Sequence, residues 1–377
     1  MPEHRPLHPA SRRHLDVLSD GPAIMQHARG TTPDPDFGYC TDDVARALGV
    51  DLLHGRELGW PVVSQGAWRS LGFLEEALEP ATGRFRNFRR TDGAWLDEAG
   101  SEDSHGRAML GLGEAIADAP DALLVERATV LFSRALPAAV SLTALRATAS
   151  VLLGCDAALR GGLDGDTRRA FELLAARLRT AFDGPAVTTV WPWPEPVLTY
   201  ENALLPRALI VAGRRLGDDA MLVSGLRTLN WLIRVQATSA GCFSPIGNRG
   251  WWPRGGTIAR FDQQPIEATA LLLAAETAWG ATGDGRYQQA AEMAYAWFLG
   301  GNELGLSVAV PATGGCGDGL TPHGVNLNQG AESTLMWLTA LETTRRLRSD
   351  DPAAVGQSVR TPALGASSPW SGAAVRP

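Results

Sequence analysis

Apolar residues recur at three- and four-residue intervals along most of the chain, which is the spacing of amphipathic helices. Phe171, Leu174 and Leu178 are one clear example. The pattern predicts two kinds of helix in alternation. Helices of the first kind carry arginines and acids on a polar face. We expect them over residues 12–29, 67–79, 122–136, 167–182, 218–237 and 286–299.

Helices of the second kind are rich in small residues, apolar on nearly all sides, and begin with polar residues. We expect them over residues 42–53, 102–117, 142–155, 201–213, 263–279 and 329–343. A helix that is apolar on most sides must be buried among other helices. Their starts recur at intervals of about 40 to 66 residues, so each pairs with an amphipathic helix in a repeated hairpin. Six such hairpins predict an all-α fold, an (α/α)6 barrel with inner and outer rings of helices.

An irregular solenoid of the HEAT or TPR type is the alternative architecture. The intervals exceed the roughly 34-residue TPR repeat, and the long loops rich in Gly, Trp and Pro precede inner helices, where a closed barrel gathers them at one end. We therefore favour the barrel. It is expected over residues 11–348, with a flexible N-terminus at 1–10 and a disordered tail at 349–377, which is rich in Ala, Ser, Pro and Gly. Short β segments are expected at 83–88 and 186–190.

Composition narrows the classes of function. The net charge of −7 disfavours nucleic acid or an anionic membrane as a partner. No secretory signal and no apolar run long enough to span a bilayer are visible, so a cytoplasmic protein is expected. All 34 basic residues are arginine, which excludes a Schiff-base lysine and a Walker A loop. The four cysteines form no CxxC pair, and neither a metal site nor a cofactor is expected.

Polar residues concentrate where the inner helices begin. Besides Thr and Ser they comprise Asp42, Asp43, Glu102, Asp103, His105, Arg107, Tyr200, Glu201, Asn202, Asp262, Gln263, Gln264, Asn328, Gln329 and Glu332, with His323 nearby. Each motif alone fits a helix N-cap, for which short polar residues and acids are preferred. Capping does not require His105, Arg107 or the amides, however. Because inner-helix starts converge at one mouth of a barrel, we expect a pocket lined by carboxylates, amides and aromatic rings.

Large aromatic residues lie in the loops before these helices. Trp191, Trp193, Trp251 and Trp252 have proline neighbours that block a helix. Such rings offer a flat apolar face to a sugar together with a polar edge. The alternative is that some of them plug the end of the barrel.

Carboxylates, amides and aromatic rings are the side chains of glycoside chemistry, which needs one protonated acid and one carboxylate base or nucleophile. Asp103 and Asp262 are the leading catalytic pair, followed by Asp43 and Glu201. The inner helix at 142–155 begins with no acid and is expected to be structural. Residues on different helix starts are seldom adjacent, so we expect a carboxyl separation of about 6.5–9.5 Å and inversion.

The motifs Thr41-Asp-Asp43, Glu102-Asp-Ser-His-Gly-Arg107, Tyr200-Glu-Asn202, Asp262-Gln-Gln264 and Asn328-Gln-Gly-Ala-Glu-Ser333 resemble those of the six-hairpin glycosidase superfamily. Within it, the chain resembles a poorly characterised bacterial group associated with glycosyltransferases. The resemblance covers about residues 12 to 346. It implies an (α/α)6 barrel but not one reaction, since members include unsaturated glucuronyl hydrolases, glucoamylase-like hydrolases, phosphorylases, polysaccharide lyases and sugar epimerases.

Within this superfamily the glucuronyl hydrolases use two aspartates, which map onto Asp43 and Asp103. The epimerases use a pair of histidines on inner helices, and in this chain only His105 matches that pattern. The sequence therefore predicts a glycoside hydrolase acting on a short or modified oligosaccharide. The alternatives are a sugar epimerase or isomerase of the same barrel type, and a non-catalytic glycan-binding accessory protein of a glycosyltransferase system. The chain could also form a homo-oligomer.

Overall fold

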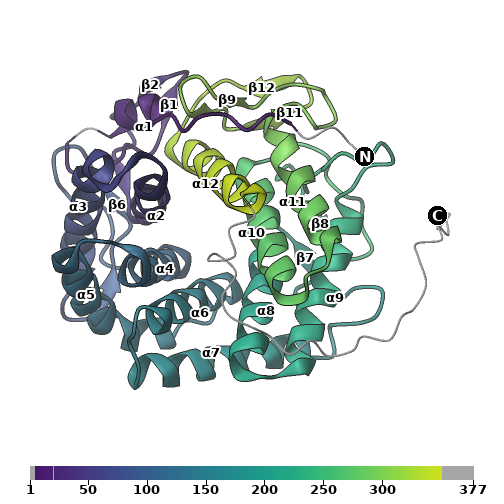
Figure 1. The fold of residues 1–377 in the computed structure, drawn as a ribbon, viewed down its shortest axis with the longest axis horizontal. Coiled ribbons are helices and arrows are strands. Elements are labelled where there is room, and N and C mark those ends of the chain that lie inside the picture. Colours follow the sequence, from purple (N-terminus) through teal and green to yellow (C-terminus); the bar gives the residue numbers. More distant parts are fainter. Residues whose placement is uncertain (1–4, 20, 350–377) are drawn as a thin grey trace.

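Six long helices form a closed inner ring. The structure is a computed structural model that describes residues 5–19 and 21–349. Each inner helix packs against the next one in the chain, and the last packs against the first (Figure 1). This ring confirms the predicted (α/α)6 barrel. Its members are α2 (Thr41–Leu58), α4 (Glu102–Asp118), α6 (Leu145–Arg160), α8 (Leu204–Leu216), α10 (Pro265–Thr282) and α12 (Ala331–Arg348).

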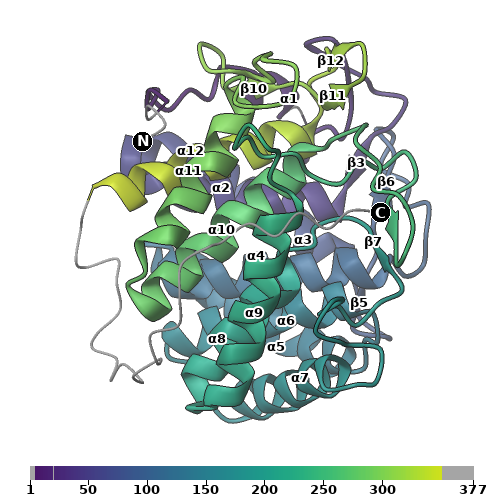
Figure 2. The ribbon, with the colours of Figure 1, turned by 90° about the vertical axis from the view of Figure 1, so that its right-hand side faces the viewer.

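An outer ring of amphipathic helices covers the inner one and buries its apolar stripe against it. In α7, for example, Phe171, Leu174 and Leu178 are buried, whereas Arg168 and Arg169 are exposed. Figure 2 shows the outer helices lying alongside their inner partners. The long outer helices are α3 (Trp60–Ala77), α5 (Ala122–Val140), α7 (Asp166–Phe182), α9 (Asp219–Val235) and α11 (Gly285–Phe298).

The sixth outer position is occupied by a single short helix, α1 (Arg13–Leu18). The expectation of a helix over residues 12–29 is therefore wrong beyond Leu18. Gly21 has a φ of 60°, and Pro22 lacks the amide proton that a helix interior needs, so the helix does not continue.

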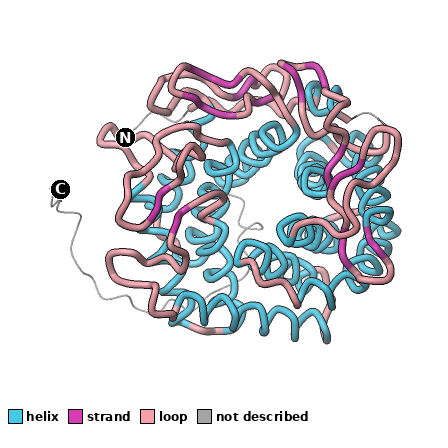
Figure 3. Tube along the Cα trace, turned by 180° about the vertical axis from the view of Figure 1, so that it is seen from behind, coloured by secondary structure: helices cyan, strands magenta, loops and turns pink. Residues whose placement is uncertain are grey.

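Short antiparallel strand pairs lie in the segments that lead into inner helices, and Figure 3 shows them gathered with the loops on one face of the ring. The β segment expected at 83–88 is confirmed, whereas residues 186–190 form turns and no strand. The pairs are β1 (Ala28–Arg29) with β2 (Thr32–Pro33), β3 (Tyr39–Cys40) with β6 (Phe88–Arg89), β4 (Leu78–Glu79) with β5 (Arg84–Phe85), β7 (Val197–Leu198) with β8 (Trp252–Pro253), β9 (Ala309–Val310) with β10 (Gly315–Cys316), and β11 (Gly319–Thr321) with β12 (Gly324–Asn326).

Glycines allow α4 and α6 to touch through their backbones. A Cβ added to Gly113 would lie 2.1 Å from the carbonyl oxygen of Gly154, and one added to Gly154 would lie 2.4 Å from the carbonyl oxygen of Met109. This explains why small residues are frequent in the inner helices. The hydrophobic core fills the space between the two rings.

Residues 5–10 have no regular secondary structure but cross α11 and α12 beside the short α1. Tyr295 donates a hydrogen bond to the carbonyl of Pro6 (3.0 Å), Arg345 to that of His8 (2.8 Å), and Arg348 to that of Arg5 (3.0 Å). This part of the segment predicted to be flexible is thus held by hydrogen bonds. The tail predicted at 349–377 lies outside the described residues, apart from Ser349. Across those described residues, no helix has the length and apolar character that crossing a bilayer demands.

Candidate functional site

A network of ion pairs joins the N-terminal ends of the inner helices, and we call it the partition. Arg46 of α2 contacts Asp43 (2.9 Å) and crosses to Glu332 of α12 (2.9 Å). Arg107 of α4 contacts Asp42 (2.5 Å) and Glu201, which precedes α8 (2.7 Å). The partition therefore consists of Asp42, Asp43, Arg46, Arg107, Glu201 and Glu332. Four helix starts far apart in the sequence meet here, as expected for a barrel.

Burial alters the acidity of Asp43, one of the partition carboxyls. Burial raises its pKa to about 7, although the adjacent Arg46 acts in the opposite direction. The side chain is almost fully covered, with 3% of the residue exposed, and also accepts a hydrogen bond from the thiol of Cys40 (3.2 Å). At neutral pH both protonation states are therefore populated, which is a property of a general acid or base.

Glu201 has a backbone conformation that non-glycine residues rarely adopt, with a φ of 47°. Buried Glu267, in the first turn of α10, holds this conformation: its carboxylate accepts hydrogen bonds from the backbone N–H of Glu201 and from the backbone and side chain of Asn202 (3.4 and 3.2 Å). Burial raises the pKa of Glu267 to about 7. Sequence reasoning did not select Glu267, although it lies in the first turn of an inner helix.

Tyr200 and Asp103 form a second polar group beside the partition. The Tyr200 hydroxyl donates to the Asp103 carboxylate, and burial raises the pKa of Tyr200, which keeps it protonated. Arg146 stacks over the Tyr200 ring at 4.7 Å and bonds to Glu195, while the half-buried ring of Trp251 lies 6.4 Å away. Arg146 belongs to α6, so this helix, which begins with no acid, contributes a charged side chain to the second polar group.

Asp262 and Gln264 lie at the start of α10 and are both partly exposed. The Asp262 carboxylate, 27% exposed, has a 3.5 Å ion pair with the exposed Arg249. Asp103 and Asp262 thus differ from the partition acids, because neither forms an ion pair with Arg46 or Arg107.

Several candidates instead support the fold. Buried His105 packs on Phe85 and accepts its backbone N–H (3.2 Å), and burial lowers the pKa of His105 to about 3, so the ring is neutral. Glu102 accepts hydrogen bonds from the backbone N–H groups of Thr143 (2.8 Å) and Ala144 (2.6 Å). These two residues immediately precede α6. Glu102 is therefore a cap for the neighbouring helix rather than a ligand contact.

The candidate amide side chains also fall into two groups, those that are buried and bonded within the fold and those that are exposed or half-buried. Buried Asn202 accepts the N–H of Thr199 (3.1 Å) and stabilises the turn before α8, and fully buried Gln263 bonds to Glu303 and Trp297. Asn328 is exposed and accepts the N–H of Gly30 (2.9 Å), and Gln329 is half-buried.

Two of the four tryptophans are core residues. Trp191 and Trp193 are 4% and 0% exposed, because they pack on Trp231 and Phe182 respectively. They pack against the outer helices α9 and α7 and present no face to a ligand. Trp252 is partly exposed but stacks on Trp231 (5.6 Å), which leaves Trp251 as the tryptophan closest to the polar groups. His323 is exposed in the turn between β11 and β12.

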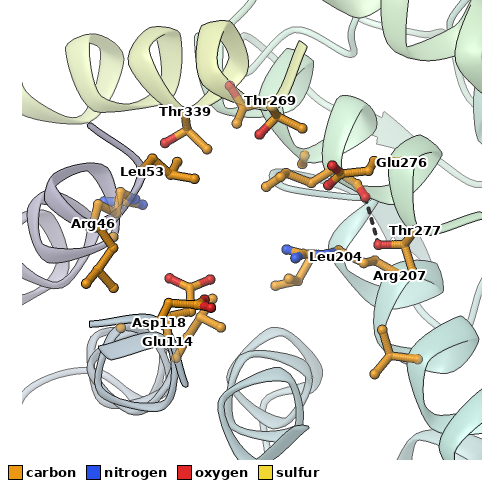
Figure 4. A pocket seen from close by; sticks show the side chains of 18 of the residues that line it. Arg46, Leu53, Glu114, Asp118, Leu204, Arg207, Thr269, Glu276, Thr277 and Thr339 are labelled. Atoms are coloured by element: carbon orange, nitrogen blue, oxygen red, sulfur yellow. Dashed lines mark hydrogen bonds between the residues drawn. The ribbon is translucent and has the colours of Figure 1, made fainter. Parts of the chain in front are cut away.

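A cavity of about 850 Å³ occupies the middle of the ring. Arg46, Arg107 and Glu201 line its inner end, and residues at the C-terminal ends of the inner helices, such as Asp118 and Arg346, also line it. Figure 4 shows side chains of several inner helices around the cavity. Asp43, Asp103 and Asp262 do not line it. The sequence predicted a pocket at the loop face. It indicated Arg107 and Glu201 but not the other charged residues of the cavity, such as Glu114 and Arg207. The sequence feature that could have identified these residues is a single charged position within an otherwise apolar stretch of an inner helix.

The described residues contain no group of three or more His, Cys, Asp or Glu side chains arranged to hold a metal ion.

Comparison with solved structures identifies proteins of the same fold. Cellobiose 2-epimerase from Spirochaeta thermophila DSM 6192 has a TM-score of 0.67 and 15% identity over 90% of this chain and 95% of its own. A D-mannose isomerase has a TM-score of 0.66 and 10% identity over 89% and 96%. A GH76 α-mannanase from Bacteroides thetaiotaomicron has a TM-score of 0.62 and 11% identity over 90% and 96%. No family model and no curated protein matches the chain.

These neighbours confirm the fold that the resemblance to the six-hairpin glycosidase superfamily implies. Membership of the narrower glycosyltransferase-associated group stays a prediction. By their names, the neighbours include epimerising, isomerising and glycan-cleaving enzymes, which is the range that this fold accommodates.

Proposed function

We propose that this protein is a carbohydrate-active enzyme, and specifically a glycoside hydrolase whose catalytic carboxylates lie at the loop face of the barrel. The fold supports the broader assignment, because the neighbours are named as sugar epimerases, a sugar isomerase and a mannanase. The arrangement of the acids supports the narrower one.

The observation that carries the proposal is the division of the acids into two groups. Asp42, Asp43, Glu201 and Glu332 each form an ion pair with one of two buried arginines. Asp103 and Asp262 lack these partners and are partly exposed. One of them can protonate the glycosidic oxygen while the other activates a water molecule. Their positions on α4 and before α10 favour a wide separation and hence inversion.

Neighbouring groups fit these roles. The Tyr200 hydroxyl, which donates to Asp103, fixes the orientation of that carboxylate. The half-buried ring of Trp251, close to Tyr200, offers a flat apolar surface on which a sugar ring can stack. Gln264 is partly exposed and has an amide that can bind sugar hydroxyls.

A sugar epimerase or isomerase is the second candidate, and two of the fold neighbours favour it directly. Such an enzyme needs an acid and a base at one sugar carbon. His105 cannot serve, because it is fully buried against Phe85 and cannot reach a substrate. Asp103 and Asp262 would have to supply both groups.

A panel of oligosaccharides tests the proposal, with detection of reducing ends and NMR of the products. We expect new reducing ends from the wild type, and a fall in turnover of ~10²-fold or more in Asp103→Asn and Asp262→Asn at an unchanged melting temperature. Asp36→Asn is the matched control, since Asp36 is 78% exposed. An isomerised product without new ends would establish the epimerase instead, and binding without turnover the accessory protein. Full activity in both Asn variants would move the catalytic roles to Asp43 and Glu201.

A further inference from the structure

Two charged side chains point into the cavity from α4 and α8. They are Glu114 and Arg207, and Figure 4 shows both directed toward the empty centre of the ring. Within the described part of the chain, neither side chain forms an ion pair or a hydrogen bond, and the Nε atom of Arg207 is buried without a hydrogen-bond partner.

Most of the neighbouring charges of the cavity are paired, and Arg214, which has no ion pair with any residue that the structure describes, is partly exposed. Arg346 binds Glu276 through two bonds of 2.8 Å, and Arg56 contacts Asp118 at 2.7 Å near the rim. Arg46 and Arg107 are held by the partition. Glu114 and Arg207 therefore stand out from their surroundings.

Leaving these charges unpaired is costly for the empty protein. Burial lowers the pKa of Arg207 and raises that of Glu114, and in each case it is the largest cause of the shift. Native proteins rarely leave buried polar groups without partners, and exceptions are frequent where a ligand completes the set. Glu114 and Arg207 face a space large enough for a small ligand.

The lining of the cavity defines the chemistry of that ligand. A guanidinium group pairs with a carboxylate or a phosphate. A carboxylate such as Glu114 accepts hydrogen bonds from hydroxyl groups. The buried hydroxyl oxygen of Thr343 also has no hydrogen-bond partner, and Leu273 and Trp279 add apolar surface.

We propose that this cavity binds a small hydroxylated organic anion, with its carboxylate or phosphate on Arg207 and its hydroxyl groups on Glu114 and Thr343. The ligand enters between the C-terminal ends of the inner helices, on the far side of the partition from Asp103 and Asp262. The site is thus separate from the proposed catalytic groups and does not depend on the reaction assigned to them.

Calorimetric titration of the full chain with D-glucuronate, glucose 6-phosphate, glucose and inorganic phosphate tests the proposal. We expect glucuronate or glucose 6-phosphate to bind, and whichever is tighter identifies the anionic group. Glucose and inorganic phosphate should each bind at least about tenfold more weakly, since each lacks one half of the recognition. Arg207→Met and Glu114→Gln should weaken binding by about tenfold or more.

Two control variants locate the site. Arg168→Met, an exposed arginine of α7 outside the cavity, and Asp103→Asn, on the loop face, should bind the probe with wild-type affinity. Unchanged binding in Arg207→Met would overturn the proposal, and so would the absence of binding by both hydroxylated anions. Equal affinity for inorganic phosphate would overturn the role of Glu114. A failure of hydrolysis leaves these results untouched, because they are measured without turnover.

Stability without ligand gives an independent readout. Arg207 attracts Glu114 and Glu276 but forms no ion pair with either. If Arg207 is kept for a ligand, Arg207→Met relieves the cost of its burial, and the melting temperature stays the same or rises. A clear fall in melting temperature would show that Arg207 is instead a structural partner of Glu114, and would overturn the proposal.

Discussion

Arg107 satisfies two carboxylates that come from different parts of the chain, Asp42 at 2.5 Å and Glu201 at 2.7 Å. We expect Arg107→Met to lower the free energy of unfolding by about 3–5 kcal/mol, because it leaves both acids without their cation in a buried place. Arg56→Met is the matched control. The Arg56 side chain is 53% exposed, so loss of its ion pair should cost at most about 1 kcal/mol. Urea denaturation measures both, and equal losses would refute the distinction.

His105 makes stability depend on pH in a defined direction. Its pKa is about 3 when folded, against 6.5 for a free imidazole. Below pH 6.5 the imidazole of His105 therefore binds a proton in the unfolded chain but not in the folded one. The free energy of unfolding falls as the pH drops through this range. In His105→Asn the side-chain oxygen can still accept the N–H of Phe85. Between pH 7 and pH 5 the wild type should lose about 2 kcal/mol more than this variant. Parallel pH profiles would contradict the assignment.

At the residue scale, local contacts could be predicted and distant ones could not. Arg46 lies three and four positions after Asp43 and Asp42, a spacing that places them on one helix face, so its role was accessible from the sequence. Arg146 bonds to Glu195 and Tyr200, 49 and 54 residues further along. These groups come together only because the ring of helices closes, and no local sequence pattern predicts that contact.

Among the helices, the contact between α4 and α6 has the least tolerance for added atoms. Gly113→Ala should cost about 1–3 kcal/mol, because the new methyl would overlap the backbone of Gly154. Gly72→Ala in α3 is the matched control. Its methyl would meet nothing within 4 Å, and alanine should stabilise that helix by about 0.5–1 kcal/mol. Thermal and chemical denaturation give both values, and a loss in Gly72→Ala would show that the contact is not the cause.

The long helices followed from the sequence because two simple patterns distinguish the rings. The helix expected at 263–279 is α10, Pro265–Thr282, and the one expected at 42–53 is α2, Thr41–Leu58. The start of α8 was placed at residue 201, whereas the helix begins at Leu204. Residues 200–202 form a turn held by Glu267, 65 and 66 residues away, so its position depends on tertiary contacts.

For the whole molecule, the sixth outer position differs from the other five. Residues 5–10 cover α11 and α12 there, and the Tyr295 hydroxyl binds the carbonyl of Pro6. Tyr295→Phe should cost about 1 kcal/mol, the usual contribution of one hydrogen bond. Hydrogen exchange should become faster in α1 and α12, while the amides of α4, on another side of the ring, serve as the internal control. Uniform acceleration throughout would contradict a local role.

Only part of the arrangement of the site could be predicted from the sequence. Alternating hairpins force the inner-helix starts to one face, so the meeting of Asp42, Asp43, Glu201 and Glu332 could be predicted. The cavity beyond the partition could not, because the direction in which Glu114 and Arg207 point depends on how each helix is rotated about its axis. That rotation is set by packing against neighbours.

The backbone contact between α4 and α6 also determines where the interior could be redesigned. Of the residues of α6, Asp156 and Arg160 line the cavity, near the end of the helix, whereas α10 and α12 contribute Thr269, Thr277, Thr339 and Thr343. A library that varies residues along the α4–α6 contact would yield mostly misfolded proteins. Substitutions of Thr339, where a longer side chain would extend into open space, offer a route to altered ligand selectivity in an unchanged scaffold.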